Sequence, residues 1–288
     1  MRLIVGCGYL GRRVAKIWRE KGVPVTALTR TETGAKALES IGIEPVIGDV
    51  TDPRTLSGIL DKAPFEGVFH AVGLDRSSGK SMEEVYVKGL ENLLEILRPD
   101  LCPKFVFISS TSVFGQTDGT WINEATPPDS LHGSGGVVRK AEILLRKKRP
   151  DSVILRFAGI YGPGRLLRGK AIAAGEPIPV DPDKWLNLIH VDDGARAVEQ
   201  AWEKGSPGAT HLIADGKPVT RGDYYRTLAR LLNAPSPQFT EGEPGSRGGP
   251  DASHRRIDSR RAQEALEWYP TYDDHEAGLR AILEEEAK

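Results

Sequence analysis

Little in this chain of 288 residues points to a secreted scaffold, a membrane or a nucleic-acid partner. Its two cysteines, Cys7 and Cys102, lie far apart and form neither a redox nor a metal-spaced pair, which argues against a disulfide framework and fits a reducing cytoplasm. No apolar run is long enough to cross a bilayer, and the first residues lack the pattern of a signal peptide. A formal net charge of −1 gives no overall field that attracts nucleic acid or an anionic membrane. We therefore expect a cytoplasmic protein without such partners.

The first two thirds of the chain alternate short apolar runs with helical patterns. The runs are nearly continuous, as expected of strands that are buried on both faces of a parallel sheet. Apolar residues at helical spacing, such as Leu10, Val14 and Trp18, lie between the runs. The alternation predicts an α/β fold, a Rossmann-type doubly wound parallel sheet that binds its ligand at the carboxyl ends of the strands. The predicted strands are Leu3–Val5, Val25–Leu28, Pro45–Gly48, Val68–Val72, Phe105–Ser109 and Val153–Phe157.

The last third of the chain predicts a smaller and less regular region. Residues 164–187 are rich in glycine and proline, and residues 235–253 predict a long loop or lid. Helical patterns cover 258–267 and 275–286. We expect two regions, each built from two segments: a Rossmann domain from 1–163 and 188–216, and a substrate-side region from 164–187 and 217–288.

A glycine pattern, Gly6-Cys7-Gly8-Tyr9-Leu10-Gly11, follows the first predicted strand and opens the first helix. In this context the pattern is typical of a dinucleotide site. The first glycine permits a tight turn, the second lets the backbone approach a pyrophosphate, and the third lets the helix pack closely on the strand. The position of Cys7 at a helix N-terminus can lower the pKa of its thiol; the alternative is a small residue that fits the turn.

The second predicted strand ends with Thr29 and Arg30. A site for NAD usually has an acidic residue here, which accepts hydrogen bonds from the ribose hydroxyls. Thr29 takes that place, and Arg12 and Arg13 begin the first helix nearby. Because guanidinium groups suit a 2′-phosphate, the sequence favours NADP, with NAD as the alternative cofactor. The alternative for the arginines is a solvated surface position.

Further cofactor contacts are expected where other strands end. A carboxylate and an apolar residue after the third strand suit an adenine ring, although Asp49 also suits a cap. Small residues at the end of the fourth strand let the backbone pass close to a cofactor. The expected contacts are Asp49, Val50, Ala71, Val72, Gly73 and Ser109.

Four stretches carry a family pattern: SSTSVFG at 109–115, RFAGIYGPG at 156–164, LIHVDD at 188–193, and the segment from Ile257 through Trp268 to Leu279. Together they resemble the short-chain dehydrogenase/reductase superfamily in its extended, epimerase/dehydratase-like form. Their details, with GSGGVV at 133–138, are most similar to an atypical, YeeZ-like branch of it. The resemblance implies a Rossmann core, a bound dinucleotide, a small C-terminal substrate region and, in many members, a homodimer.

The proton-transfer motif of that family, Tyr-x-x-x-Lys followed by x-x-Ala-Glu, is missing. Ala141 and Glu142 fix the register, which puts Val138 in the lysine position and Ser134 in the tyrosine position. A phenol whose pKa is lowered by a nearby ammonium group moves protons near neutral pH. A serine hydroxyl does not easily replace it without a base, and Val138 lowers no pKa.

Other residues remain as candidate catalytic groups. Ser110 matches the substrate-orienting serine or threonine that the resemblance implies, and Ser134 supplies a second hydroxyl. Tyr161, His132 and His190 are candidate replacement acids, each with a structural role as its alternative.

Two functions therefore stay open at this point. The first is an NADP-dependent oxidoreductase or epimerase/dehydratase-like enzyme that uses a non-standard proton donor on a small carbonyl or sugar-nucleotide-like substrate. The second is a non-catalytic NADP-binding redox sensor or regulatory protein, which keeps the glycine pattern and Arg30 but has lost the proton-transfer motif.

Overall fold

The computed structural model describes residues 1–241 and 253–287. Its centre is a sheet of seven strands whose neighbours all run parallel. The strands are β1 (Arg2–Val5), β2 (Val25–Thr29), β3 (Glu44–Ile47), β4 (Gly67–His70), β5 (Lys104–Ser110), β7 (Val153–Phe157) and β12 (Thr210–Ile213). Their order is β12-β7-β5-β4-β1-β2-β3, so the winding direction reverses between β1 and β4. A doubly wound sheet binds ligands at such a switch point.

Helices cover both faces of the sheet because alternate strand residues point to opposite sides. Ile4, Phe69 and Leu155 pack on one side with α1 (Gly11–Glu20), α2 (Glu32–Glu39), α7 (Val191–Lys204) and α9 (Arg260–Leu266). Leu3, Val68 and Phe105 pack on the other side with α3 (Ser57–Leu60), α4 (Gly89–Ile96) and α5 (Gly133–Lys148). Burial of both faces explains why the strands are nearly continuous apolar runs.

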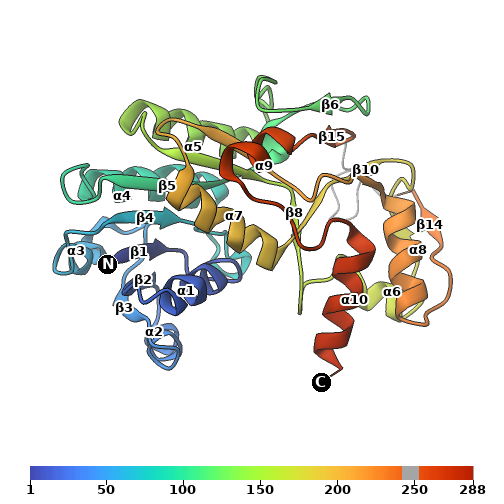
Figure 1. Ribbon diagram of the computed structural model, residues 1–288, viewed down its shortest axis with the longest axis horizontal. Coiled ribbons are helices and arrows are strands. Elements are labelled where there is room, and N and C mark those ends of the chain that lie inside the picture. The colour runs from blue at the N-terminus through green and yellow to red at the C-terminus, as the bar shows by residue number, and fades with distance from the viewer. Residues whose placement is uncertain (242–252, 288) are drawn as a thin grey trace.

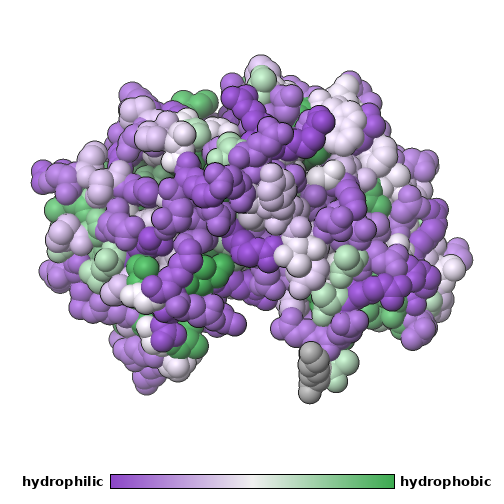
Figure 2. All heavy atoms as spheres, viewed as in Figure 1, coloured by the Kyte–Doolittle hydropathy of each residue, from purple (hydrophilic) through white to green (hydrophobic). Residues whose placement is uncertain are grey.

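A third hydrophobic cluster lies beyond the sheet and joins α6 (Gly169–Ala173), α8 (Arg221–Leu231) and α10 (His275–Glu286). These three helices lie together on the right of Figure 1. Figure 2 shows a notch in the same face between the part that holds α1 and α2 and the part that ends in α10. Short strand pairs connect the segments: β8 (Gly159–Tyr161) with β11 (Leu188–His190), β9 (Ile178–Pro179) with β14 (Phe239–Thr240), β10 (Trp185–Leu186) with β13 (Val219–Thr220), and β6 (Trp121–Ile122) with β15 (Arg256–Ile257).

The predicted Rossmann-type fold is confirmed, and each of the six predicted strands lies within a residue or two of an observed one. The seventh strand, β12, was missed because its four residues, Thr-His-Leu-Ile, are too short and too polar to show a pattern. The irregular segment 164–187 contains α6, β9 and β10, and β14 lies inside the predicted loop 235–253. Residues 242–252 of that loop lie outside the described residues.

The division into two regions stays a prediction. Ala262 and Leu266 of α9, which falls in the segment assigned to the substrate side, pack with α7 in the cluster that covers the sheet. Over residues 1–241 and 253–287, no helix is both long and apolar enough to cross a membrane.

A buried ion pair fixes α5 on the sheet. Arg156 of β7 donates to both carboxylate oxygens of Glu142, through Nε at 2.9 Å and Nη2 at 2.8 Å. Ser109 of β5 donates its hydroxyl to the same carboxylate at 2.5 Å. Both charged side chains are less than a tenth exposed. Because a paired and hydrogen-bonded charge is tolerated in the interior only with its partners in place, these contacts specify the register of α5 against β5 and β7.

We predict that Glu142→Ala lowers the free energy of unfolding by about 3–5 kcal/mol, because it leaves the Arg156 guanidinium buried without a counter-charge. Urea unfolding followed by circular dichroism measures the change. Glu95→Ala is the matched control, since Glu95 pairs with Lys148 at 3.5 Å on the exposed surface; it should cost less than about 1 kcal/mol. Equal losses in the two variants would contradict the proposed role of the buried pair.

Candidate functional site

A cavity of about 770 Å³ lies at the carboxyl ends of β1, β2, β4 and β5. All the predicted cofactor contacts line it: Gly6, Gly8, Tyr9, Leu10, Gly11, Thr29, Arg30, Asp49, Val50, Ala71, Val72, Gly73 and Ser109. Its volume is within the range of small-molecule and cofactor sites. The structure thus brings these residues together, while their contact with a cofactor remains a prediction.

The three glycines of the first turn have different surroundings. Gly6 has φ 97°, and a Cβ there would lie 2.5 Å from the carbonyl of Ala71, which directly follows β4. A Cβ on Gly11 would lie 2.7 Å from the Gly6 oxygen, so both glycines are required by packing inside the protein. A Cβ on Gly8 would have no atom within 4 Å. The open space at Gly8 is where a pyrophosphate would need to approach the backbone, so the turn fits a dinucleotide.

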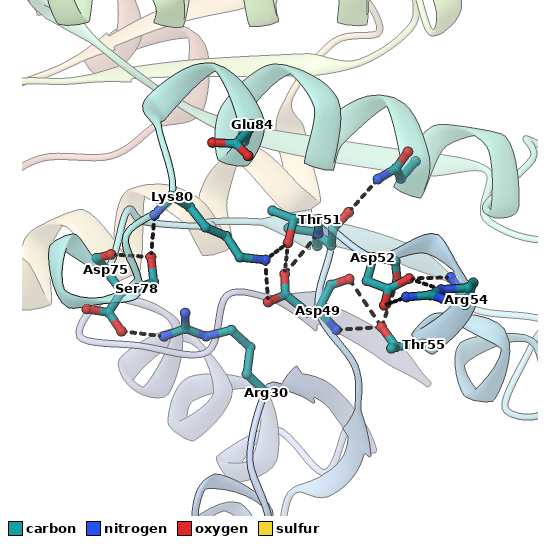
Figure 3. A network of polar contacts seen from close by, with 12 residues as sticks. Arg30, Asp49, Thr51, Asp52, Arg54, Thr55, Asp75, Ser78, Lys80 and Glu84 are labelled. Carbon is teal, nitrogen blue, oxygen red and sulfur yellow. Dashed lines mark hydrogen bonds and ion pairs between the residues drawn. The ribbon is translucent and has the colours of Figure 1, made fainter.

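Two ion pairs cross the cavity at the end formed by β2 and β3 (Figure 3). Arg30 donates to Asp75 at 2.8 Å, and Lys80 donates to Asp49 at 3.2 Å and also to Thr51. Hydrogen bonds from Ser77 and from Arg30 lower the pKa of Asp75 to about 2. Both carboxylates belong to residues that line the cavity, so this end of the site already contains paired charges.

Two further cations line the cavity without such partners. Among the described residues, neither Arg12 nor Arg165 has an ion pair or a side-chain hydrogen bond. Arg13 differs, because its Nε donates to Asp192 at 2.7 Å and the residue does not line the cavity. The lining therefore has two more cationic than anionic side chains among the described residues.

The first turn of α5 holds no acid or base against the cavity. Only Val138 and Ala141 of this helix line it. Ser134 is exposed and does not, and His132 is an exposed residue just before the helix. A Cβ on Gly135 would overlap the carbonyl oxygen of Ser112, so glycine lets the helix approach that backbone. The part of the cavity wall that α5 forms therefore has neither the tyrosine nor the lysine of the family motif.

The other candidate catalytic groups have different positions. Ser110 lines the cavity, and its oxygen accepts a hydrogen bond from the Ser112 amide at 3.1 Å, which leaves its own proton free to donate. Tyr161 is fully buried beside Gly278, does not line the cavity, and has a pKa raised by burial. His190 is buried and does not line it either; its Nδ1 accepts from the Asp192 amide at 3.3 Å. Both Tyr161 and His190 therefore have packing and capping contacts.

Two tyrosines do line the cavity, and sequence reasoning gave neither an acid-base role. The Tyr9 hydroxyl donates to the Pro163 carbonyl oxygen at 3.0 Å, so its proton is already used. The Tyr86 hydroxyl accepts from the Leu74 amide at 3.0 Å, so its proton remains available. Tyr86 lies in η3 (Glu84–Lys88), a π-helical turn of a kind that is frequent at functional sites. The sequence does contain one signal for this turn, since a serine and a glutamate three residues apart predict a capping box at a helix start. Here the Ser81 amide donates to the Glu84 carboxylate at 2.8 Å, and the Glu84 amide donates to the Ser81 hydroxyl at 3.2 Å.

Comparisons with known proteins agree with this geometry. The model of the NAD dependent epimerase/dehydratase family matches residues 3–214. Protein YeeZ of Escherichia coli (strain K12) is 32% identical over 244 residues, which are 82% of this chain and 85% of that protein. A putative NAD-dependent epimerase/dehydratase from Methylobacillus flagellatus is 30% identical, with a TM-score of 0.80 and coverage of 100% and 98% of the two chains. UDP-glucose 4-epimerase from Bifidobacterium longum, solved with NAD⁺ and UDP, is 19% identical, with a TM-score of 0.79 and coverage of 100% and 99%; this likeness concerns the fold.

The thiol of Cys7 lies in the glycine turn and lines the cavity. Burial raises the pKa of Cys7 to about 11, against a lowering by Arg12. Loss of solvent therefore outweighs the nearby guanidinium, which favours the alternative that Cys7 is a small residue that fits the turn.

We predict that alkylation of Cys7 by iodoacetamide becomes about tenfold faster with each pH unit from about pH 7 to pH 9.5, because the thiolate is the reactive form. Mass spectrometry of the peptide that contains Cys7 gives the rate. Cys102 is the internal control; burial raises its pKa to about 12, and it should stay unlabelled. A plateau in the Cys7 rate below about pH 9 would indicate a lowered pKa and contradict the prediction.

Proposed function

The chain belongs to the NAD dependent epimerase/dehydratase family, and on that premise we propose that it is an oxidoreductase or epimerase/dehydratase-like enzyme that prefers NADP(H) to NAD(H). The observation that carries the preference is Arg30 at the end of β2, in the cavity wall and next to Thr29, where an NAD site has an acid. Arg12, which has no ion pair within the described part of the chain, lies in the same wall and adds positive charge.

Several residues of the chain would hold the cofactor. The glycine turn and the start of α1 suit the pyrophosphate, and Asp49 with Val50 suits the adenine. NADP, when bound, supplies hydride transfer to or from a small carbonyl or sugar-nucleotide-like substrate. Ala71, Val72 and Gly73 offer a close backbone surface along the cavity wall.

Arg30 is not free in this structure, since it pairs with Asp75 across the cavity. A 2′-phosphate competes with that carboxylate for the guanidinium. Arg30 is about half exposed, so its pair with Asp75 is weak enough to exchange for a phosphate. We therefore infer that Asp75 limits the NADP preference, while Arg30 creates it.

The proton donor must come from outside α5. Ser110 keeps a hydroxyl proton to orient a carbonyl oxygen, and Tyr86 keeps a phenolic proton. We propose Tyr86 as the acid and Ser110 as the orienting donor.

A second candidate function, a non-catalytic NADP-binding sensor, is favoured by one observation: Val138 occupies the wall where the family has its lysine. A homodimer remains a prediction.

We predict that Arg30→Ala weakens NADPH binding by at least tenfold and leaves NADH binding unchanged, because only NADPH has a 2′-phosphate. Tenfold corresponds to about 1.4 kcal/mol, within the range of a hydrogen bond to a charged group. Asp75→Asn should strengthen NADPH binding by a few-fold. Titration calorimetry of cofactor-free protein measures both.

Gly8→Ala is the control, because its Cβ meets no protein atom and should block only the bound pyrophosphate. This variant should keep its melting temperature and bind neither cofactor. If wild-type protein binds NADH as tightly as NADPH, the proposed preference is wrong; if it binds neither, the whole proposed function is wrong.

We predict that Tyr86→Phe lowers kcat by about a hundredfold or more at saturating NADPH, the usual contribution of a general acid, without weakening NADPH binding. Tyr269→Phe is the control and should change kcat by less than about threefold, because Tyr269 is exposed and does not line the cavity. The assay uses a panel of ketones, aldehydes and sugar nucleotides. Tight NADPH binding without turnover of any of them by wild-type protein would favour the sensor.

A further inference from the structure

Arg165 reaches the cofactor cavity from the segment that follows β8, not from the strands and helices that form the glycine turn. Its guanidinium carbon lies 5.4 Å from the centre of the Tyr9 ring, and Tyr9 directly follows Gly8. The Arg165 side chain therefore lies beside the glycine turn. It has no ion pair or side-chain hydrogen bond with any described residue.

The turn that carries Arg165 is held at three points. The Arg165 amide donates to the Gly162 oxygen at 2.9 Å, which closes the turn. The Tyr9 hydroxyl donates to Pro163 at 3.0 Å, and the Gly164 amide donates to Glu286 of α10 at 2.8 Å. A Cβ on Gly162 would lie 2.5 Å from the Tyr9 hydroxyl, so only glycine allows this contact. These contacts fix the backbone of the turn next to Tyr9, so the exposed Arg165 side chain starts from a fixed point beside the glycine turn.

The charges of the cavity indicate what Arg165 binds. Asp75 neutralises Arg30 and Asp49 neutralises Lys80, while Arg12 and Arg165 stay without counter-charges among the described residues. Arg12 also lines a shallow groove with Lys16, Arg19, Ile41 and Ile43, which places it on the side of α1 that faces the end of α2. Arg165, the other cation without such a partner among the described residues, reaches the cavity from the segment after β8, which the sequence assigns to the substrate side. A guanidinium binds a phosphate oxygen pair through forked hydrogen bonds.

We propose that Arg165 is a cofactor-binding residue that closes over the pyrophosphate of the dinucleotide from the substrate side. The inference rests on the proposed function, because it requires a dinucleotide on the glycine turn. The pyrophosphate is common to NADPH and NADH, so Arg165 contributes affinity for both, whereas Arg30 contributes affinity for NADPH alone. Through Gly164 and Glu286, the same turn connects cofactor binding to α10.

The test is titration calorimetry of wild-type protein, Arg165→Ala, Arg165→Lys and Lys16→Ala with NADPH and with NADH, at low and high salt. Arg165→Ala should weaken both cofactors by the same factor, about tenfold, and should reduce the salt dependence of binding. Arg165→Lys should fall between it and wild type, because lysine keeps the charge but not the fork. Lys16→Ala is the matched control: Lys16 is an exposed cation of α1 that pairs with Glu20 at 3.9 Å and does not line the cavity, so its loss should change either affinity by less than about twofold.

Two results would overturn the inference while the proposed function stands. In the first, the affinity of Arg165→Ala for both cofactors stays within twofold of wild type. Arg165 would then be assigned to an anionic group of the substrate instead of the cofactor. The second is a loss confined to NADPH, which would assign Arg165 to the 2′-phosphate. Equal loss for both cofactors in a protein without NADP preference would support Arg165 and reject the NADP proposal. If wild-type protein binds neither cofactor, both proposals are wrong. Melting temperatures of all variants control for unfolding.

Discussion

The buried contact among Glu142, Arg156 and Ser109 determines how the site is built. It joins α5 to β5 and β7 at one carboxylate, so neither a shift nor a rotation of the helix is possible without burying an unpaired charge. This register places Val138 against the cavity and leaves Ser134 at the surface. The same contact commits the Ser109 hydroxyl to the protein interior, so Ser110 is left as the serine of that strand end with a proton to donate.

The fold and the nucleotide end of the cavity could be predicted from the sequence because local patterns encode them. Buried parallel strands read as continuous apolar runs, and the glycine pattern needs only its neighbouring strand and helix to be interpreted. The strand β12 could not be predicted because four residues that include Thr210 and His211 give no periodicity. Asp75, Lys80 and Arg165 were also missed, since each reaches the cavity from a loop or turn whose course is set by tertiary contacts.

The candidate catalytic residues could not be predicted from the sequence either, because the fold keeps some of them away from the cavity. The family pattern drew attention to Ser134 and Tyr161, yet one is exposed and the other is sealed beside Gly278. Tyr86 lies far from the motif in the sequence, so the family pattern did not indicate it as a candidate. Its phenol reaches the cavity wall from η3. Which hydroxyls keep a proton depends on whether their partner is an amide or a carbonyl, and only the folded chain reveals that.

The cavity wall has an excess of cationic side chains that suit an anion, whereas the groups proposed to move a proton are two hydroxyls. Two of its cations have no ion pair with any described residue, one on α1 and one on a turn tied to α10, so a pyrophosphate bound by both would bridge two parts of the chain. In a sensor this bridging would itself be the output, because it links cofactor binding to the position of α10. In an enzyme the same bridging would close the substrate side over the cofactor before Tyr86 and Ser110 act. Cofactor binding, which both functions require, depends in this proposal on Arg165 and the glycine turn rather than on α5, so it is compatible with the loss of the family's tyrosine and lysine from that helix.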